Sequence, residues 1–290
     1  MGERTRTSSA VAAATVTLSR AGVVSARADA EFLAAAVLAV PRGRLALTDG
    51  FTGAALARFE ELVARRATRE PLQHLIGSAA FRYLELAVGP GVFVPRPETE
   101  LLAGWGIDEA RRVAGPATVV DLCTGSGAIA LAVANEVPSA RVVAVESSPA
   151  ALAWLRRNAT ERAAAGDRAI EVVEADVTDP ELLDGLTGRV DVLLCNPPYV
   201  PDGTPVPPEV ADHDPAQAVF GGPDGLVVIR PVIMRAAELL RPGGVVGIEH
   251  DDTHAGAVPA LLAASGHFGD IASQRDLTDR PRFATARRNP

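Results

Sequence analysis

The segment VVDLCTGSGAIA, residues 119–130, decides the fold of this 290-residue chain. Its first four residues are apolar except for one aspartate, which predicts a buried strand. Gly125 and Gly127 then permit a tight turn and a close approach of the backbone to a ligand. Residues 128–136 predict a helix. A strand that passes into a helix through a glycine-rich turn is typical of the first half of a βαβ unit.

The alternation of strand and helix continues through the second half of the chain. Further strands are expected at 141–145, 170–173, 190–195 and 245–249, and further helices at 149–162 and about 231–240. This order predicts an α/β fold with a doubly wound, mostly parallel sheet and right-handed crossovers. Ligands of such sheets bind beyond the carboxyl ends of the strands, so the loops at those ends are the candidate site.

The first strand ends in Asp121, and this residue separates two possible cofactors. Residues 125–130 (GSGAIA) match the dinucleotide fingerprint, which makes an NAD oxidoreductase one alternative. A carboxylate at the strand end is poorly placed beside a pyrophosphate, but it suits the cationic amino-acid end of S-adenosylmethionine. Glu146 ends the second strand, where a carboxylate can bind both hydroxyls of a ribose. The two acids together favour S-adenosylmethionine, and no catalytic His, Lys or Tyr cluster supports the NAD alternative.

Two residues after the third strand complete the expected cofactor site. Asp176 can accept the adenine amino group, and Val177 can pack against the ring. The residues expected to contact the cofactor are Asp121, Cys123, Thr124, Gly125, Ser126, Gly127, Glu146, Asp176, Val177 and Asn196.

The strand at 190–195 is followed at once by Asn196, Pro197, Pro198 and Tyr199. Two consecutive prolines end the strand and make the turn rigid. The Asn196 side-chain oxygen and the Pro197 carbonyl can each accept one hydrogen of a target –NH2 group, while Tyr199 packs against its planar face. Two such acceptors stabilise the positive charge that an amide nitrogen develops during transfer. We therefore expect chemistry on an amino or amide nitrogen, with Asn196, Pro197 and Tyr199 catalytic and all four residues binding the substrate.

The N-terminal part of the chain predicts a separate helical domain. Apolar residues recur there at helical spacing, in the stripes Leu33, Val37, Val40 and Leu56, Phe59, Val63. We expect residues 1–75 to form this domain and to dock a substrate. Residues 83–88 and 92–94, around Gly-Pro-Gly, predict a β-hairpin within a linker over 76–95, and residues 96–290 form the catalytic domain.

Composition excludes several classes of protein. No apolar run approaches the ~18 residues of a membrane span. All 28 basic residues are arginine; residues 1–90 carry a net charge of +3 and residues 91–290 a net charge of −11. An acidic catalytic half repels phosphate backbones, so no stable nucleic-acid partner is expected. The only cysteines, Cys123 and Cys195, lack metal-ligand spacing and fit a reducing cytoplasm, so no metal is expected.

The chain resembles the HemK-type protein-(glutamine-N5) methyltransferases over nearly its whole length. The segments that carry the resemblance are REPLQHLIG (69–77), PRPETE (95–100), the cofactor loop (121–127), NPPY (196–199), GGPDGL (221–226), Glu249 and Asp276-Leu277 with Arg280. NPPY alone also occurs in adenine-N6 DNA methyltransferases, whereas NPPY with PRPETE and the helical leader is much more specific.

The resemblance implies a Rossmann-like methyltransferase sheet of seven strands and a peptide chain release factor as partner. Methyl transfer from S-adenosylmethionine would go to the glutamine of the release factor's Gly-Gly-Gln loop, with a monomeric enzyme in the cytoplasm. Cys123 stands where the family commonly has glycine, so the first turn of the loop must tolerate a Cβ atom. Glu146 replaces the more usual aspartate.

Two other functions remain as alternatives. One is methylation of N6 of adenine or N2 of guanine in a nucleic acid, which would need a basic groove or a target-recognition domain. The other is a non-catalytic binding module with a vestigial cofactor fold, against which the intact Asp121, Glu146 and Asn196 argue.

Overall fold

The computed structural model describes residues 4–290 and divides the chain into two compact units. The first, the helical unit, comprises the chain up to Ser78 together with Val206–His213. The second, the sheet unit, comprises Ala79–Pro205 and Asp214–Pro290. No helix within the described residues is long and apolar enough to cross a membrane.

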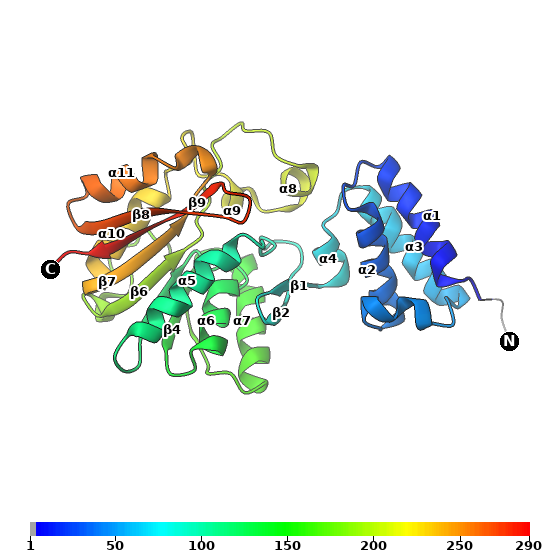
Figure 1. Cartoon of the computed structure of the whole chain (residues 1–290), viewed down its shortest axis with the longest axis horizontal. Helices are drawn as coiled ribbons and strands as arrows, with labels where there is room; N and C mark the ends of the chain where they lie inside the picture. Colours follow the sequence, from blue (N-terminus) through cyan, green and yellow to red (C-terminus); the bar gives the residue numbers. More distant parts are fainter. Residues whose placement is uncertain (1–3) are drawn as a thin grey trace. The chain divides into compact units, whose positions relative to one another are not determined.

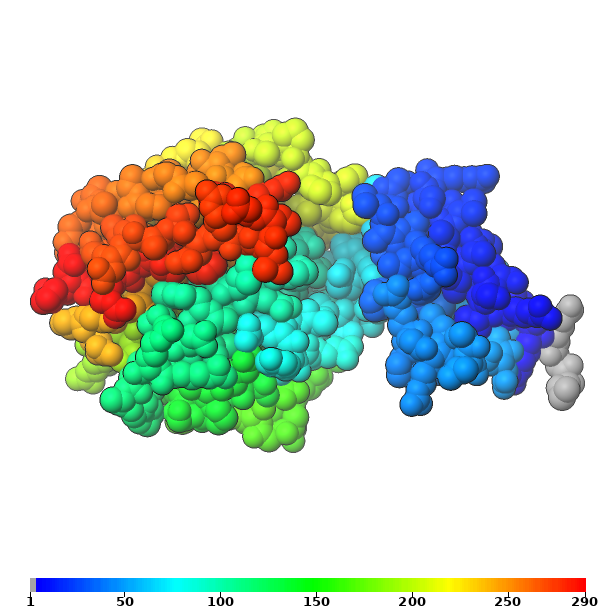
Figure 2. Space-filling view, in the orientation of Figure 1, coloured from blue at the N-terminus to red at the C-terminus, as the bar shows by residue number. Residues whose placement is uncertain are grey.

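The helical unit is a bundle around its own apolar core. Its elements are α1 (Thr7–Arg20), α2 (Ala26–Leu38), the 3₁₀ helix η1 (Arg42–Leu47), α3 (Gly53–Ala67), α4 (Leu72–Ile76) and α8 (Pro208–His213). Leu18 and Leu33 are fully buried beside Phe51 and Phe59, whose rings stack with centroids 4.9 Å apart. The blue part of the chain forms one closely packed body in Figure 2.

A buried ion network joins α8 to the other helices of this unit. Arg66 is buried and donates to Asp29 (2.8 Å) and to Glu209 (2.8 Å), and Arg69 donates to both oxygens of Glu209 (2.8 and 2.7 Å). Although burial favours the protonated acid, the hydrogen bonds from these two arginines lower the pKa of Glu209 to about 2. The segment after the NPPY turn is therefore anchored in the helical unit.

The sheet unit contains a seven-stranded sheet in the order β5-β4-β3-β6-β7-β9-β8 (Figure 1). Its strands are β3 (Thr118–Leu122), β4 (Arg141–Glu146), β5 (Glu171–Glu174), β6 (Val190–Cys195), β7 (Leu240–Glu249), β8 (Phe268–Arg275) and β9 (Pro281–Arg288). The first five in this order are parallel, and β9 runs antiparallel to both β7 and β8.

Helices cover both faces of this sheet. Their bounds are α5 (Thr99–Arg112), α6 (Ala128–Glu136), α7 (Pro149–Ala164), α9 (Ala216–Val219), α10 (Ile229–Leu239) and α11 (Ala257–Ala264), with 3₁₀ turns η2 (Asp184–Leu186) and η3 (Asp252–His254). Alternate strand residues enter two separate cores: Val119 packs in the core with α5, α6 and α7, and Val120 in the core with α10 and α11. Because both faces are buried, the strands are apolar on both sides, as doubly wound sheets require.

The α/β class, the parallel sheet and the predicted strands and helices of the sheet unit are confirmed, with boundaries shifted by a few residues at β5, β7 and α10. Of the predicted hairpin, the strand at 83–88 is confirmed as β2, but the partner strand at 92–94 is wrong. The small sheet pairs β1 (Ser78–Phe81) with β2 (Leu84–Ala87), because Arg82 adopts a left-handed φ of 51° and turns the chain there. Residues 92–94 form no strand; Val92 and Val94 instead bury their side chains against α7.

Candidate active site

The candidate site lies where the strand order reverses, between β3 and β6. From β3 the chain proceeds outward to β4 and β5 and then returns to β6 on the other side of β3. Leu122 pairs with Cys195, so the loop after β3 and the tetrapeptide after β6 begin side by side at the carboxyl edge. The reversal opens a crevice at this edge in doubly wound sheets, which is where their ligands bind.

Asp121 is fully buried at the centre of this edge. Its Oδ2 accepts hydrogen bonds from the Thr124 hydroxyl and from the Ala130 N–H (3.1 Å). Its Oδ1 is buried with no hydrogen-bond partner among the described residues, and burial raises the pKa of this carboxyl to about 7. A buried acceptor without a donor is costly. Asp121 therefore fits a ligand that brings a hydrogen-bond donor or a positive charge.

The loop after β3 is held in left-handed backbone conformations. Gly125 and Gly127 have φ values of 59° and 89°, and a Cβ on Gly127 would lie 2.6 Å from Leu155. Cys123 also adopts a left-handed φ, 56°, although it carries a side chain. The turn therefore accommodates a Cβ at Cys123 in a conformation that glycine adopts without strain.

Glu146 ends β4 and binds the backbone of the same loop. Its Oε2 accepts from the Gly125 N–H (2.8 Å), and its Oε1 accepts from the N–H groups of Ser147 (3.0 Å) and Ser148 (2.8 Å). The sequence suggested a ribose ligand but not this second role. Glu146 fixes the cofactor loop as well as presenting a carboxylate at the carboxyl edge, and its ribose contact stays a prediction.

Asp176 and Val177 follow β5 at this edge, because the Ala175 N–H binds the Glu146 carbonyl (3.1 Å). Val177 is buried, whereas Asp176 is exposed and its Oδ1 accepts from the Thr178 N–H (2.7 Å) and hydroxyl (2.6 Å). This oxygen of Asp176 therefore caps its own turn, and the adenine contact also stays a prediction.

Asn158 of α7 supports the cofactor loop from behind, a role that the sequence analysis missed. It is buried, and its amide binds the Ala87 N–H (2.8 Å), the Ala87 carbonyl (3.0 Å) and the Ser126 carbonyl (2.9 Å). These bonds connect β2 to the loop. The available signal was a polar residue on the apolar face of the predicted helix.

The NPPY tetrapeptide leaves β6 as a partly exposed turn. Pro197 and Pro198 are buried, whereas Asn196 and Tyr199 are half-buried. The Asn196 Nδ2 donates to the Thr99 hydroxyl (3.1 Å), which leaves the Asn196 Oδ1 as an acceptor.

Tyr199 points its hydroxyl to the buried carboxylate at the end of β7, where it donates to the Glu249 Oε1 (3.1 Å). Burial raises the pKa of Tyr199 well above its ordinary value, and the Glu249 charge adds to this effect. The phenol therefore stays protonated and acts as a donor.

The glycine-rich segment at 221–225 packs against the tetrapeptide backbone. A Cβ on Gly221 would lie 2.5 Å from the Pro198 carbonyl oxygen, and a Cβ on Gly225 would collide with the Tyr199 carbonyl oxygen. Gly221 N–H also binds the Val200 carbonyl (2.9 Å). These glycines are required because the two backbone segments are in direct contact.

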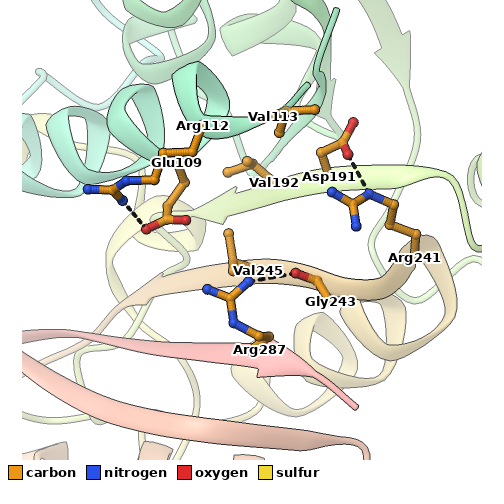
Figure 3. Close-up of a pocket in the computed structure, with 9 residues that line it drawn as sticks. All are labelled: Glu109, Arg112, Val113, Asp191, Val192, Arg241, Gly243, Val245 and Arg287. Atoms are coloured by element: carbon orange, nitrogen blue, oxygen red, sulfur yellow. Dashed lines mark hydrogen bonds and ion pairs between the residues drawn. The ribbon is translucent and has the colours of Figure 1, made fainter. Parts of the chain in front are cut away.

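A pocket of about 100 Å³ lies at the other end of the strands, at the start of β6 and along β7 (Figure 3). Its arginines are already paired: Arg241 donates to Asp191 (2.5 Å), Arg112 to Glu109, and Arg287 to the Gly243 carbonyl (2.7 Å). The amino end of a parallel sheet is not where its ligands bind, and these guanidinium groups are already engaged, so this pocket is not the candidate site.

Comparison with known proteins shows the family of the chain. Residues 9–77 match a family model described as the PrmC N-terminal domain, and residues 109–211 match the methyltransferase small domain. The release factor glutamine methyltransferase of Mycolicibacterium smegmatis is 55% identical over 98% of both chains, and that of Streptomyces coelicolor is 51% identical over 96% of both chains. Among solved structures, the hMettl16 catalytic domain in complex with an RNA hairpin has a TM-score of 0.54 at 14% identity, covering 82% of each chain, which shows a shared fold alone.

Proposed function

The chain belongs to the release factor glutamine methyltransferase family, and we propose that it transfers a methyl group from S-adenosylmethionine to a glutamine side-chain amide nitrogen of a release factor. By the resemblance of its motifs, the target is the glutamine of the Gly-Gly-Gln loop. The observation that carries the proposal is the pairing of Leu122 with Cys195, which sets the Asn196 turn beside the Asp121 loop.

The cofactor is assigned to the edge formed by Asp121, Glu146 and the glycine loop. When bound there, S-adenosylmethionine supplies an electrophilic methyl group on a sulfonium. Asp121 Oδ1 is a buried acceptor without a donor, which suits the ammonium of the amino-acid end. Glu146 Oε2 accepts a single hydrogen bond from Gly125 and keeps a lone pair for a ribose hydroxyl. Asp176 and Val177, at the end of the next strand, are proposed to contact the adenine.

Asn196 and Pro197 bind the target nitrogen through its two hydrogens. The Asn196 Oδ1 and the Pro197 carbonyl each accept one N–H, which holds the nitrogen lone pair toward the methyl group. Alignment of this kind contributes on the order of 7–11 kcal/mol to lowering a barrier. On accepting the methyl group the target nitrogen would become positive, and the Asn196 and Pro197 oxygens would stabilise that charge. One N–H proton then leaves to solvent, since an N-protonated amide is strongly acidic.

Tyr199 and the two prolines exclude water and shape the site. The buried prolines make the turn rigid, and the ring of Tyr199 is available to pack against the flat amide group. The helical unit, residues 1–75 of the expected domain division, is proposed to dock the release factor. We further propose a cytoplasmic enzyme that acts as a monomer.

Transfer to a nucleobase is the second candidate, because the same tetrapeptide serves adenine N6. The net charge of −11 over residues 91–290 disfavours it. The test is incubation of the purified chain with methyl-labelled S-adenosylmethionine and either a release factor, its loop Gln→Ala variant, or DNA and RNA. Label on the intact release factor alone is expected. Label on the variant or on nucleic acid would overturn the proposal.

A further inference from the structure

His254, at the end of η3, is a buried polar residue that the proposed transfer does not use. Its Nε2 lies 3.0 Å from the Asp224 carbonyl oxygen. Because a carbonyl oxygen can only accept, the Nε2 carries the proton and donates. The Nδ1 is buried with no hydrogen-bond partner among the described residues, which is costly. Stability alone therefore does not explain a histidine at this position.

The turn after β7 holds the backbone of His254 in place. The Asp251 Oδ1 accepts from the Thr253 N–H (3.0 Å) and hydroxyl (2.6 Å), and the Asp251 carbonyl accepts from the His254 N–H (2.9 Å). At the start of the same turn, the His250 N–H binds the Arg282 carbonyl of β9 (2.9 Å). The His254 ring is therefore attached to the carboxyl edge of the sheet through a capped turn.

The His254 ring meets the NPPY backbone at Gly225. A Cβ on Gly225 would lie 2.6 Å from the His254 Cε1 and 2.3 Å from the Tyr199 carbonyl oxygen. The ring and this carbonyl oxygen therefore lie beside the same point of the backbone. Asp224, which accepts the hydrogen bond from the ring, is the residue just before Gly225. His254 therefore fixes residues 224–225 where they touch the tetrapeptide.

Backbone hydrogen bonds join the same segment to the chain that leaves the NPPY turn. The Gly221 N–H binds the Val200 carbonyl (2.9 Å), and the Asp202 N–H binds the Gly222 carbonyl (3.0 Å). The Gly225 N–H also binds the Gly222 carbonyl (3.0 Å), which closes the segment into a turn. A displacement of residues 224–225 is therefore passed on to the residues after the tetrapeptide as well as to the tetrapeptide itself.

We propose that His254 is a positioning residue that supports the NPPY turn through residues 224–225. Its ring holds this segment against the tetrapeptide backbone, which keeps the Asn196 and Pro197 oxygens in place for the target nitrogen. The inference rests on the proposed function, in which those two oxygens accept the substrate N–H groups. The cofactor residues Asp121 and Glu146 stand at the ends of other strands, so cofactor affinity should not depend on His254.

The first experiment compares His254→Met with His254→Gln. Both side chains are unbranched and similar in length, but only glutamine keeps a donor for the Asp224 carbonyl. At saturating S-adenosylmethionine and release factor, His254→Met should lower kcat by roughly 10- to 100-fold, the effect of a displacement of about 1 Å at the reacting groups. The KM for the release factor and the cofactor affinity in calorimetry should stay within about twofold of the wild type. His254→Gln should keep kcat within about threefold.

His267→Met is the matched control, since His267 is half-buried in the turn before β8. It should leave kcat, KM and cofactor affinity within about twofold of the wild type. An unchanged kcat in His254→Met, or a His254→Gln as impaired as His254→Met, would overturn the inference. A wild-type chain that labels no release factor would instead overturn the proposed function.

Hydrogen exchange followed by mass spectrometry tests the support of the turn without relying on activity. In His254→Met, peptides that cover residues 198–202 and 219–227 should exchange roughly 5- to 10-fold faster than in the wild type, because local opening becomes easier when one hydrogen bond is lost. Peptides from β3 and β4 should keep their protection, and His254→Gln should restore the slow exchange. Equal exchange in wild type and His254→Met would overturn the inference even if no activity were measured.

His254→Asn provides the same test if methionine prevents folding. Asparagine is one methylene shorter than glutamine, so its amide lies near the place of the histidine Nδ1 and loses the bond to the Asp224 carbonyl. His254→Asn should therefore show the lower kcat and the faster exchange, whereas His254→Gln should show neither. Equal kcat and equal exchange in these two variants would refute the role of His254.

Discussion

Glu249→Gln is expected to make the protein more stable at neutral and alkaline pH. Glutamine has the shape of the carboxyl group and can still accept from the Tyr199 hydroxyl, but it carries no charge to bury. Burial raises the pKa of Glu249 from its ordinary 4.5 to about 7. An acid whose folded pKa is raised contributes stability at low pH, and that stability is lost as the pH rises from about 4.5 through 7.

The size of the effect follows from the two pKa values. Glu249 ionises less readily in the folded protein than in the unfolded chain. At pH 8 this difference in pKa lowers the free energy of unfolding by roughly 3 kcal/mol. The variant avoids this cost. The stability difference between variant and wild type should grow by roughly 2–3 kcal/mol from pH 5 to pH 8, in favour of the variant at pH 8.

Urea unfolding at pH 5, 6, 7 and 8 measures this difference, since the linear extrapolation gives the free energy at each pH. Glu181→Gln, at an exposed position of the sheet unit, is the matched control and should change stability by no more than about 0.5 kcal/mol at any pH. The reasoning is refuted if the free energy of unfolding has the same pH dependence in wild type and Glu249→Gln, or if the variant is less stable than the wild type at pH 8. Either result would show that burying the ionised Glu249 does not destabilise the folded protein.

Three further substitutions test the remaining parts of the structure. Asn196→Ala should keep the affinity for S-adenosylmethionine in calorimetry but lower kcat by about 10²- to 10³-fold, because one of two charge-stabilising acceptors is lost; unchanged turnover would contradict the mechanism. Glu146→Ala should weaken cofactor binding by roughly tenfold or more, since both the ribose acceptor and the Gly125 contact disappear, and equal affinity would remove its ribose role. Glu209→Gln should destabilise the helical unit by about 1–3 kcal/mol in urea unfolding, because Arg66 is buried and loses one of its carboxylate partners; an unchanged midpoint would show that the ion network adds no net stability.

The fold of the sheet unit was largely predictable from the chain. Strands β3, β4 and β6 and helices α6 and α7 were found within two residues of their ends, because each combines an apolar run with a glycine, proline or serine at its boundary. The β1–β2 hairpin was misplaced because its turn uses Arg82 in a left-handed conformation, which no local sequence rule predicts. The antiparallel strands β8 and β9 were not located individually, since β8 is mostly exposed and lacks a continuous apolar pattern.

The sequence predicted the residues of the candidate site that stand at the strand ends, but not the residues that support them. Asp121, Glu146 and Asn196 each stand at or just after the end of a predicted strand, so parallel-sheet topology alone brings them to one edge. Asn158, Thr99 and the second role of Glu146 were not predicted, because their partners are backbone or side-chain atoms from distant parts of the chain.

The sequence by itself therefore determined the class of sheet, the edge at which ligands bind and the family of the enzyme. Those properties depend on local periodicity and on short contiguous motifs, and the chain carries both. The tertiary structure decided which buried residues contact Asn196 and Tyr199. The support of the NPPY turn comes from two hydrogen bonds, one from the Asn196 Nδ2 to the Thr99 hydroxyl, 97 positions away, and one from the Tyr199 hydroxyl to Glu249, 50 positions away. Only the packing of α5 and β7 against the end of β6 brings their polar atoms within hydrogen-bond distance, so no pattern along the chain could have revealed it.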